Sequence, residues 1–331
     1  MIVLDNNEKV VGTVTDGDVR RGLLKNLMMN DVVSKIMNTH PIVVPATFAQ
    51  DSMLELMKAN DIFHIPVVDE AGRLVGVVER FSSSTIPTHK LTAMIMAGGE
   101  GVRLRPLTES IPKPMLKVGG KPILEILIEC LRKCGFSKVI LNVGYLSEVI
   151  QDYFGDGKKF NIEIGYTVEM SKLGTAGPLG LLNSDQIPTE PFLVINGDII
   201  TNLNFKMFRD FHINGDYDFT LCGHPHKVEI PFGYPVVDGD LVKGFEEKPK
   251  FTYLVNSGIY CLSPKVLKYI PQNKFMDMTD LISECLRNKH RIGLFPLGEK
   301  FHEIGQISSF KEAESFYCEV FGVKNAKSKN Q

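Results

Sequence analysis

A glycine-rich and basic stretch of the chain has the residue types needed to bind phosphate. The segment AGGEGVRLRPLTESIPKPM (97–115) places three glycines directly after an apolar run and then adds Arg103 and Lys113. Glycine turns expose backbone N–H groups to an anion, and guanidinium groups match phosphate oxygens in geometry. Ligands of an open parallel sheet lie at the carboxyl ends of its strands. The stretch therefore predicts a nucleotide-binding loop.

This loop does not follow either common phosphate-binding pattern. The GxxxxGK[ST] motif is absent, and GxGxxG would need a glycine at 104, where the chain has Leu104. Pro112 and Pro114 flank Lys113 and stiffen the segment that holds it. We therefore expect a phosphate site of another kind.

The longer stretch AGGEGVRLRPLTESIPKPMLKVGGKP (97–122) resembles the GGxGxRLxPLT…PKPM region of sugar-1-phosphate nucleotidyltransferases. The resemblance implies that Arg103 and Lys113 are catalytic. It also implies that the loop residues Ala97, Gly98, Gly99 and Gly101 bind the nucleotide. The chain departs from the family at Val102, where members usually have Thr, so one hydroxyl that could contact phosphate is missing.

A second segment, LGTAGPL (173–179), resembles the part of the family that lies against the base, in the form found in mannose-1-phosphate guanylyltransferases. By this likeness, the base of GTP is bound by Gly174, Thr175, Ala176 and Gly177. Small residues there would let the backbone approach a flat purine. Outside this context, GTAG equally fits the beginning of a helix.

Two acidic residues fall where the family holds Mg²⁺. VINGDII (194–200) places Asp198 after an expected strand, and FHEIGQISSF (301–310) matches W-x-D-x-G with Phe and Glu303 in place of Trp and Asp. Mg²⁺ requires near-octahedral geometry at about 2.1 Å. The longer Glu303 side chain therefore binds the metal directly, acts through a water molecule, or shifts the preference towards Mn²⁺. An isolated Asp after Gly is otherwise a turn residue.

Two further segments, PFGYPVVDGDLVKGFEEKP (231–249) and LVNSGIYCLSP (254–264), resemble the sugar-facing strands of the family. The residues that bind the sugar phosphate by this likeness are Gly233, Glu247, Lys248 and Asn256. Gly233 would let the sugar lie on the backbone, Glu247 would accept from sugar hydroxyls, and Lys248 would pair with the phosphate. Without the family, EEKPK is a solvated turn.

The first part of the chain contains an internal repeat. VLDNNEKVVG (3–12) and VVDEAGRLVG (67–76) lie 64 positions apart, and each predicts a β-hairpin. Between them, 33–66 predicts a short strand, a helix and a strand entry. Residues 1–84 resemble a small α+β pair of cystathionine-β-synthase (CBS) domains, and we expect the first unit to be incomplete.

CBS pairs often bind adenine nucleotides through a Thr/Ser-x-x-Asp that follows the hairpin. Thr15 and Asp18 match this pattern, which implies a regulatory nucleotide there. The alternatives are a turn with a helix N-cap and a pair whose role is packing or dimerisation.

From Leu91 onward, apolar strand-like runs alternate with helical patterns. Strands are expected at 91–97, 138–144, 162–169, 192–197 and 217–224, and helices at 123–135 and 146–155. This alternation predicts βαβ units and an α/β fold. We expect a Rossmann-like, glycosyltransferase-A-like domain with a mixed, mostly parallel sheet at 92–318, after a linker at 85–91 and before a polar tail at 319–331.

Composition limits the partners of the chain. Its 331 residues include 37 basic and 39 acidic ones, a net charge of −2. This balance predicts neither nucleic acid nor a membrane as partner. The six cysteines are scattered without a CxxC pair, which favours reduced thiols in a cytoplasmic protein. Because CBS pairs often associate, we expect a homo-oligomer.

The resemblance implies transfer of GMP from GTP to glucosamine-1-phosphate or mannose-1-phosphate, for bacterial surface or flagellin glycans. Uridylyl or thymidylyl transfer to a hexose-1-phosphate is the alternative. A nucleotide-sensing regulator that has lost turnover is an alternative of another class, motivated by Val102 and Glu303.

Overall fold

The computed structural model describes residues 1–25, 27, 30–60, 62–79 and 90–322. The chain divides into two compact units, Met1–Thr88 and His89–Gln331. The division falls within the expected linker. Residues 85–89 of that linker, and 323–331 of the expected polar tail, lie outside the described residues.

The first unit contains the two predicted hairpins. One pairs β1 (Ile2–Leu4) with β2 (Val10–Thr13), and the other pairs β4 (His64–Val68) with β5 (Leu74–Glu79), both antiparallel. Strand β3 (Val44–Pro45) runs parallel to β4. A single bridge between Lys9 and Arg73 connects the hairpins. The remaining elements are α1 (Asp16–Leu24), η1 (Val33–Lys35) and α2 (Gln50–Ala59).

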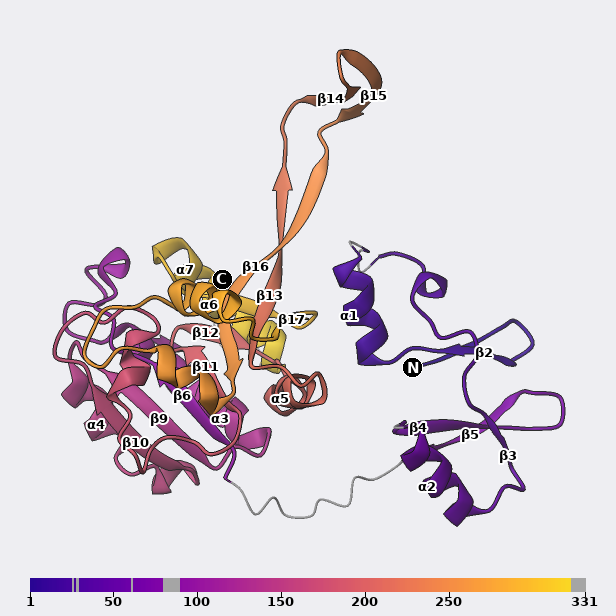
Figure 1. The fold of residues 1–331 in the computed structure, drawn as a ribbon, viewed down its shortest axis with the longest axis horizontal. Helices are drawn as coiled ribbons and strands as arrows, with labels where there is room; N and C mark the ends of the chain where they lie inside the picture. The colour runs from indigo at the N-terminus through magenta and orange to yellow at the C-terminus, as the bar shows by residue number, and fades with distance from the viewer. Residues whose placement is uncertain (26, 28–29, 61, 80–89, 323–331) are drawn as a thin grey trace, which may run out of the picture. The chain divides into compact units, whose positions relative to one another are not determined.

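The second unit is built on a seven-stranded sheet with the order β10-β9-β6-β11-β16-β13-β17 (Figure 1). Its strands are β6 (Thr92–Met96), β9 (Lys138–Val143), β10 (Glu163–Val168), β11 (Phe192–Asn196), β13 (Phe219–Glu229), β16 (Lys250–Leu262) and β17 (Ile292–Pro296). Only β16 runs antiparallel to its neighbours, β11 and β13. The sheet is therefore mixed and mostly parallel, which confirms the predicted fold class.

Alternation along the strands supplies a core on each face of this sheet. In β6, Ala93 and Ile95 belong to one buried cluster and Met94 to the other, as expected when successive side chains point to opposite faces. The helices are α3 (Ile123–Lys133), α4 (Ser147–Phe154), α5 (Phe205–Asn214), α6 (Met278–Arg287) and α7 (Ile307–Phe321). Helix α7 continues past residue 318, where we expected the domain to end.

Short elements connect this framework. They are η2 (Val102–Leu104), η3 (Lys113–Met115), η4 (Lys158–Phe160), η5 (Gly177–Leu181), η6 (Pro264–Tyr269), the hairpin of β7 (Lys117–Val118) with β8 (Lys121–Pro122), and the pair of β12 (Ile199–Thr201) with β18 (Phe301–Glu303). None of the six cysteines forms a disulfide. Within the described part of the chain, no helix combines the length and apolar character needed to cross a bilayer.

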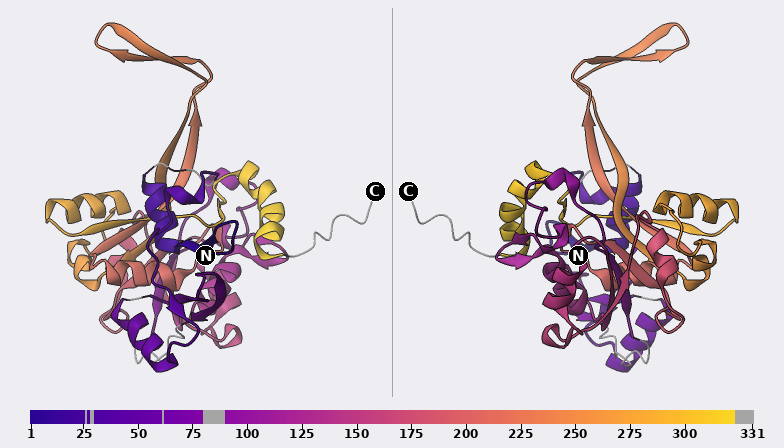
Figure 2. Two further views of the ribbon diagram at one scale, coloured as in Figure 1. Left: turned by 90° about the vertical axis from the view of Figure 1, so that its right-hand side faces the viewer. Right: turned by 90° about the vertical axis from the view of Figure 1, so that its left-hand side faces the viewer.

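Strands β13 and β16 continue far beyond the rest of the sheet. Strand β17 pairs with β13 only up to Gly223, and β11 pairs with β16 only from Ile259 onward. Beyond these points the two strands pair with each other alone among the described residues, and they lead to the hairpin of β14 (Gly233–Asp238) with β15 (Leu241–Glu247). We call residues 224–255 the ribbon; it stands away from the body of the domain (Figures 1 and 2).

Candidate active site

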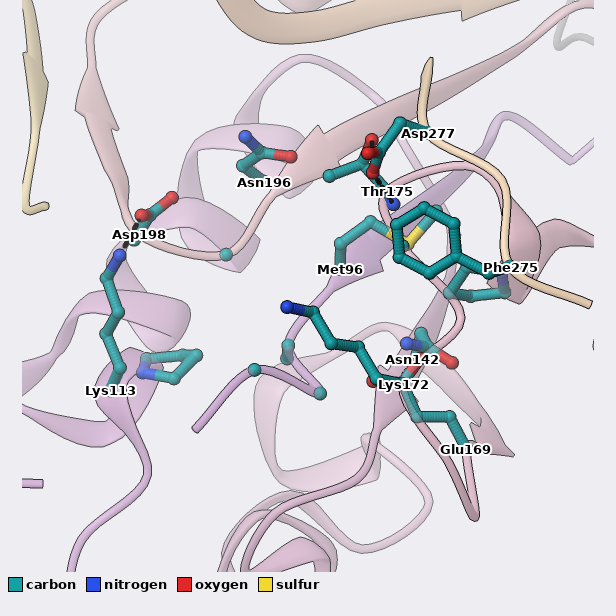
Figure 3. A pocket seen from close by; sticks show the side chains of 17 residues that line it. Met96, Lys113, Asn142, Glu169, Lys172, Thr175, Asn196, Asp198, Phe275 and Asp277 are labelled. Carbon is teal, nitrogen blue, oxygen red and sulfur yellow. Dashed lines mark hydrogen bonds and ion pairs between the residues drawn. The ribbon is translucent and has the colours of Figure 1, made fainter. Parts of the chain in front are cut away.

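A cleft of about 420 Å³ opens at the carboxyl ends of four adjacent strands, β10, β9, β6 and β11 (Figure 3). Each strand contributes its last residues or those that come after it. The lining residues are Met96, Ala97, Gly98, Gly99, Lys113, Pro114, Asn142, Glu169, Lys172, Gly174, Thr175, Pro178, Asn196, Gly197, Asp198, Phe275 and Asp277. This edge is where a parallel sheet of this type binds its ligands.

The glycine turn after β6 is shaped by close contacts. A Cβ on Gly98 would lie 2.4 Å from Oε1 of Glu169, so a larger residue here would have to displace the Glu169 carboxylate. Gly101 adopts a left-handed φ of 63°, and a Cβ there would lie 3.0 Å from Cβ of Lys113. Gly98 and Gly99 therefore line the cleft, whereas Gly101 supports the segment that carries Lys113.

Lys113 and Asp198 form an ion pair at one end of the cleft (Figure 3). Their side chains are only 15% and 12% exposed. The sequence predicts both residues as functional and separates them by 85 positions. The fold brings them together because η3 lies beside the turn after β11.

Glu303 is held next to this pair by strand pairing. Strand β18 runs antiparallel to β12, with Glu303 opposite Ile199, and the N–H of Ile304 donates to the carbonyl of Asp198 at 3.0 Å. Burial raises the pKa of Glu303, and so does the Asp198 carboxylate. Lys113 and Arg103 oppose this shift. Two carboxylates and two cations thus form one cluster.

The chemistry of this cluster fits a divalent cation. Asp198 and Glu303 are two neighbouring carboxylates, and the described residues include no group of three or more His, Cys, Asp or Glu side chains suited to a metal. Mg²⁺ is commonly bound by one or two carboxylates together with waters and substrate phosphates. Two adjacent carboxylates beside a candidate triphosphate loop match that pattern.

Of the GTAG segment, only the first half faces the cleft. Gly174 and Thr175 line it, whereas Ala176 and Gly177 are buried and donate their N–H groups to the carbonyl of Met276 at 2.9 Å. The Thr175 hydroxyl accepts from the N–H of Met278 at 2.7 Å. The segment therefore also holds the first turn of α6 in place.

Several residues that line the cleft were not identified from the sequence, among them the polar residues Asn142, Glu169 and Lys172. In Figure 3 the Glu169 carboxylate lies beside Asn142, and the Lys172 side chain extends across the cleft. Oε2 of Glu169 is buried without a hydrogen bond among the described residues. Burial raises the pKa of Glu169, partly offset by Asn142 and the Leu173 backbone. The sequence offered one signal for Glu169: it ends the strand expected at 162–169, and the carboxyl end of a strand in a parallel sheet is where a ligand binds.

The expected sugar-phosphate residues are not gathered at the cleft. Gly233 stands opposite Glu247 in the β14–β15 hairpin, and Lys248 comes next with a φ of 48°. All three belong to the ribbon, which stands away from the body of the domain (Figures 1 and 2), and none of them lines the cleft. Asn256 lies at the root of the ribbon, where its Nδ2 donates to the Tyr260 hydroxyl at 2.7 Å.

Thr15 and Asp18, in the first unit, bond to each other. Thr15 is the N-cap of α1, and its hydroxyl donates to Oδ2 of Asp18 at 2.7 Å. Asp18 in turn accepts from the Thr15 N–H at 2.8 Å and pairs with Arg21. The helix N-cap considered for this motif is thus formed.

Comparison with known proteins matches each unit to a family. The nucleotidyl transferase model matches residues 92–320, and the CBS domain model matches residues 33–81. The chain is 33% identical over 241 residues to a UTP–glucose-1-phosphate uridylyltransferase of Synechocystis sp., covering 67% of this chain and 62% of the relative. It is 38% identical over 243 residues to the mannose-1-phosphate guanylyltransferase catalytic subunit beta of Drosophila pseudoobscura pseudoobscura, covering 71% and 65%.

The chain therefore spans somewhat less than two thirds of the length of these curated relatives. Among solved structures, HddC from Yersinia pseudotuberculosis, complexed with GMP-PN, superimposes with a TM-score of 0.54 at 28% identity. The match covers 69% of this chain and 99% of HddC.

Proposed function

The chain belongs to the nucleotidyl transferase family, and from this premise we propose that it transfers GMP from GTP to a sugar-1-phosphate and releases pyrophosphate. Glucosamine-1-phosphate and mannose-1-phosphate are the proposed acceptors. The observation that supports the reaction class is the cluster of Lys113, Asp198, Glu303 and Arg103 beside the glycine turn.

The proposed reaction needs positioning and charge stabilisation more than proton transfer. A phosphate oxygen of the sugar-1-phosphate is already an anion at neutral pH. It forms a bond to the α-phosphorus of GTP, and the bond from that phosphorus to the β-phosphate oxygen breaks with its electron pair leaving on pyrophosphate. Lys113 stabilises charge at the α-phosphate. Arg103 and the N–H groups of Gly98 and Gly99 bind the β- and γ-phosphates.

Asp198 and Glu303 would hold Mg²⁺, or Mn²⁺ in its place. The bound cation would neutralise phosphate charge next to the two carboxylates. Lys113 and Arg103 balance these carboxylates when nucleotide is absent.

Glu169 supports guanine as the base. The hydrogen-bonding edge of guanine presents an N1–H and a 2-amino group side by side, and a carboxylate is a double acceptor that matches them. Uracil presents one N–H between two carbonyl oxygens, which a carboxylate would repel. Glu169 lines the cleft, and its carboxylate, when turned towards the base, would favour guanine over uracil.

Pyrophosphate release from each of GTP, UTP, dTTP, CTP and ATP, against a panel of sugar-1-phosphates with Mg²⁺ or Mn²⁺, tests this function. We expect release with GTP and a hexosamine- or mannose-1-phosphate. Release with UTP or dTTP alone would favour the uridylyl or thymidylyl alternative, motivated by the 33% identical uridylyltransferase. No release with any pair would favour the nucleotide-sensing regulator. AMP or ATP added to the active pair tests the regulatory role of Thr15 and Asp18.

A further inference from the structure

The ribbon exposes apolar side chains along most of its length. All seven residues of β15 are exposed. The exposed apolar residues include Val228, Phe232, Tyr234, Val236, Val237, Leu241, Val242, Phe245, Tyr253 and Val255, with Phe232 at 72% and Phe245 at 67%. Contiguous exposed apolar surface of this kind marks an interaction site.

The ribbon also lacks neighbouring strands in the described part of the chain. Beyond Gly223 and Asn256 its two strands pair only with each other. A two-stranded hairpin by itself is marginally stable in water, and its open edges are ready to pair with another surface. The ribbon therefore requires a partner to bury it.

The cleft, for its part, is incomplete for the proposed reaction. Its lining cations are Lys113 and Lys172, and Lys113 is paired with Asp198. In the proposed function Arg103 and Lys113 act on the triphosphate, so no cation of the described cleft is assigned to the sugar phosphate. Lys248, with Glu247 and Gly233 beside it, stands at the base of the β14–β15 hairpin, where its side chain is exposed.

Continuous pairing keeps the ribbon from folding back onto its own cleft. The ladder runs from His224 opposite Val255 to Glu229 opposite Lys250. The Ile230 N–H then donates to the Pro249 carbonyl at 3.1 Å, and pairing resumes at Gly233 opposite Glu247. Within the ribbon, all of whose residues the structure describes, no long unpaired segment is left to act as a hinge. Closure within one chain would therefore have to bend the ribbon at the short interruption between Ile230 and Gly233, which is held by pairing on both sides.

We propose that the ribbon docks on the cleft of a second copy of this chain and completes the sugar-phosphate end of that copy's site with Lys248. The role of Lys248 in this docking rests on the proposed function. In a two-fold symmetric dimer, each chain would place its ribbon on the other chain, and both apolar surfaces would be buried. Two-fold dimers are the commonest symmetric assemblies of identical chains. Each active site would then consist of the cleft of one chain and the ribbon of the other.

Mixed-isotope cross-linking tests this docking without any turnover. Unlabelled and ¹⁵N-labelled chains are mixed, exchanged and treated with an amine-reactive cross-linker. We expect links from Lys248 to Lys172 or Lys113 in mixed-isotope form. Links between these lysines found only within one isotope would overturn the proposal.

Solution mass gives a second readout independent of turnover. We expect light scattering to give the mass of a dimer for the wild type and of a monomer for Leu241→Asp, at a ribbon position that is 65% exposed. Leu286→Asp on α6, at a position 60% exposed, is the matched control and should stay dimeric. A monomeric wild type, or a Leu241→Asp variant that stays dimeric, would contradict the proposal.

Subunit mixing tests the composite site. Lys113→Ala and Lys248→Ala chains, each inactive alone, should recover about a quarter of wild-type turnover after random exchange, because half the dimers are mixed and one of their two sites is intact. Lys113→Ala mixed with Arg103→Ala is the control and should recover nothing, since both changes lie outside the ribbon and every site would keep one defect.

The outcomes separate this inference from the proposed function. Wild-type turnover with no recovery on mixing would overturn the docking and leave the function standing. Mixed-isotope links in a protein without turnover would refute the function and support the docking.

Discussion

Asp198 and Glu303 lie side by side because the backbone carbonyl of one accepts a hydrogen bond from the residue after the other, Ile304, at 3.0 Å. The fold therefore sets the spacing of these carboxylates through the β12–β18 pair, whether or not a cation is bound. Keeping two like charges in a partly buried place is unfavourable. Lys113 and Arg103 offset this repulsion, so the four residues behave as one electrostatic unit.

Replacing Lys113 by alanine should lower kcat by at least ~10²-fold, because the charge that stabilises the transition state at the α-phosphate is lost. The thermal midpoint should change little. Lys117→Ala, at an exposed position on β7, is the matched control and should keep wild-type turnover. Near-normal turnover in the Lys113→Ala variant would rule out its catalytic assignment.

Glu303→Ala should raise the Mg²⁺ concentration needed for half-maximal activity by at least ~10-fold, because loss of even a residue that supports a metal ligand costs ~10- to 100-fold. Glu303→Asp tests the length of the side chain. If the backbone of β18 is placed for glutamate, the shorter residue should also weaken Mg²⁺ activation. Activation curves that match the wild type in both variants would exclude Glu303 as a ligand.

Glu169→Gln should reduce the preference for GTP over UTP by ~10- to 100-fold in kcat/KM, since a good bidentate contact to a base contributes about 1–3 kcal/mol of discrimination. The amide replaces one acceptor oxygen by a donor and so opposes the guanine edge. ITP, which lacks the 2-amino group, should bind less well than GTP to the wild type. A variant with unchanged base preference would show that Glu169 does not contact the base.

The domain should lose stability as the pH falls below about 6.5. His212 is 1% exposed; its Nδ1 lies 2.9 Å from the Thr220 hydroxyl, and its Nε2 lies 3.1 Å from the Ser263 hydroxyl. Burial lowers the pKa of His212 to about 4. The unfolded chain therefore binds the proton first, and between about pH 6.5 and 4 up to about 3 kcal/mol of stability is lost.

Denaturant unfolding at pH 7 and at pH 4.5 measures this loss. The pH dependence should be shallower in a His212→Gln variant, whose side chain does not titrate. Equal pH dependence in the variant and the wild type would assign the effect to other groups.

Much of the sheet could be predicted from local patterns. Apolar runs bounded by glycine placed strands at 91–97, 138–144 and 192–197, close to the observed β6, β9 and β11. The carboxyl ends of these strands indicated where a ligand site would lie. The order of the motifs along the chain indicated which residues would bind phosphate, base and metal there. Lys113 and Asp198 come together because of the α/β fold, which the alternation of strand and helix patterns predicts.

The rest depends on contacts between distant segments. The close approach of Gly98 to Glu169 is set by where two loops meet, which no local pattern records. The position of Lys248 depends on how far β13 and β16 continue as a pair. The residue types around Gly233 and Glu247 indicate a sugar-binding role, but they do not indicate whether these residues lie at the cleft or on the ribbon.

Gly258 lies where the ribbon leaves the sheet and also touches the wall of the cleft. It has a φ of 72°, and a Cβ there would lie 2.4 Å from Nδ2 of Asn196, which lines the cleft. Ser257 donates to the Cys222 carbonyl at 2.8 Å and ties this point to β13. The backbone at 258 thus contacts both the cleft wall and the start of the ribbon, so a side chain added there would disturb both.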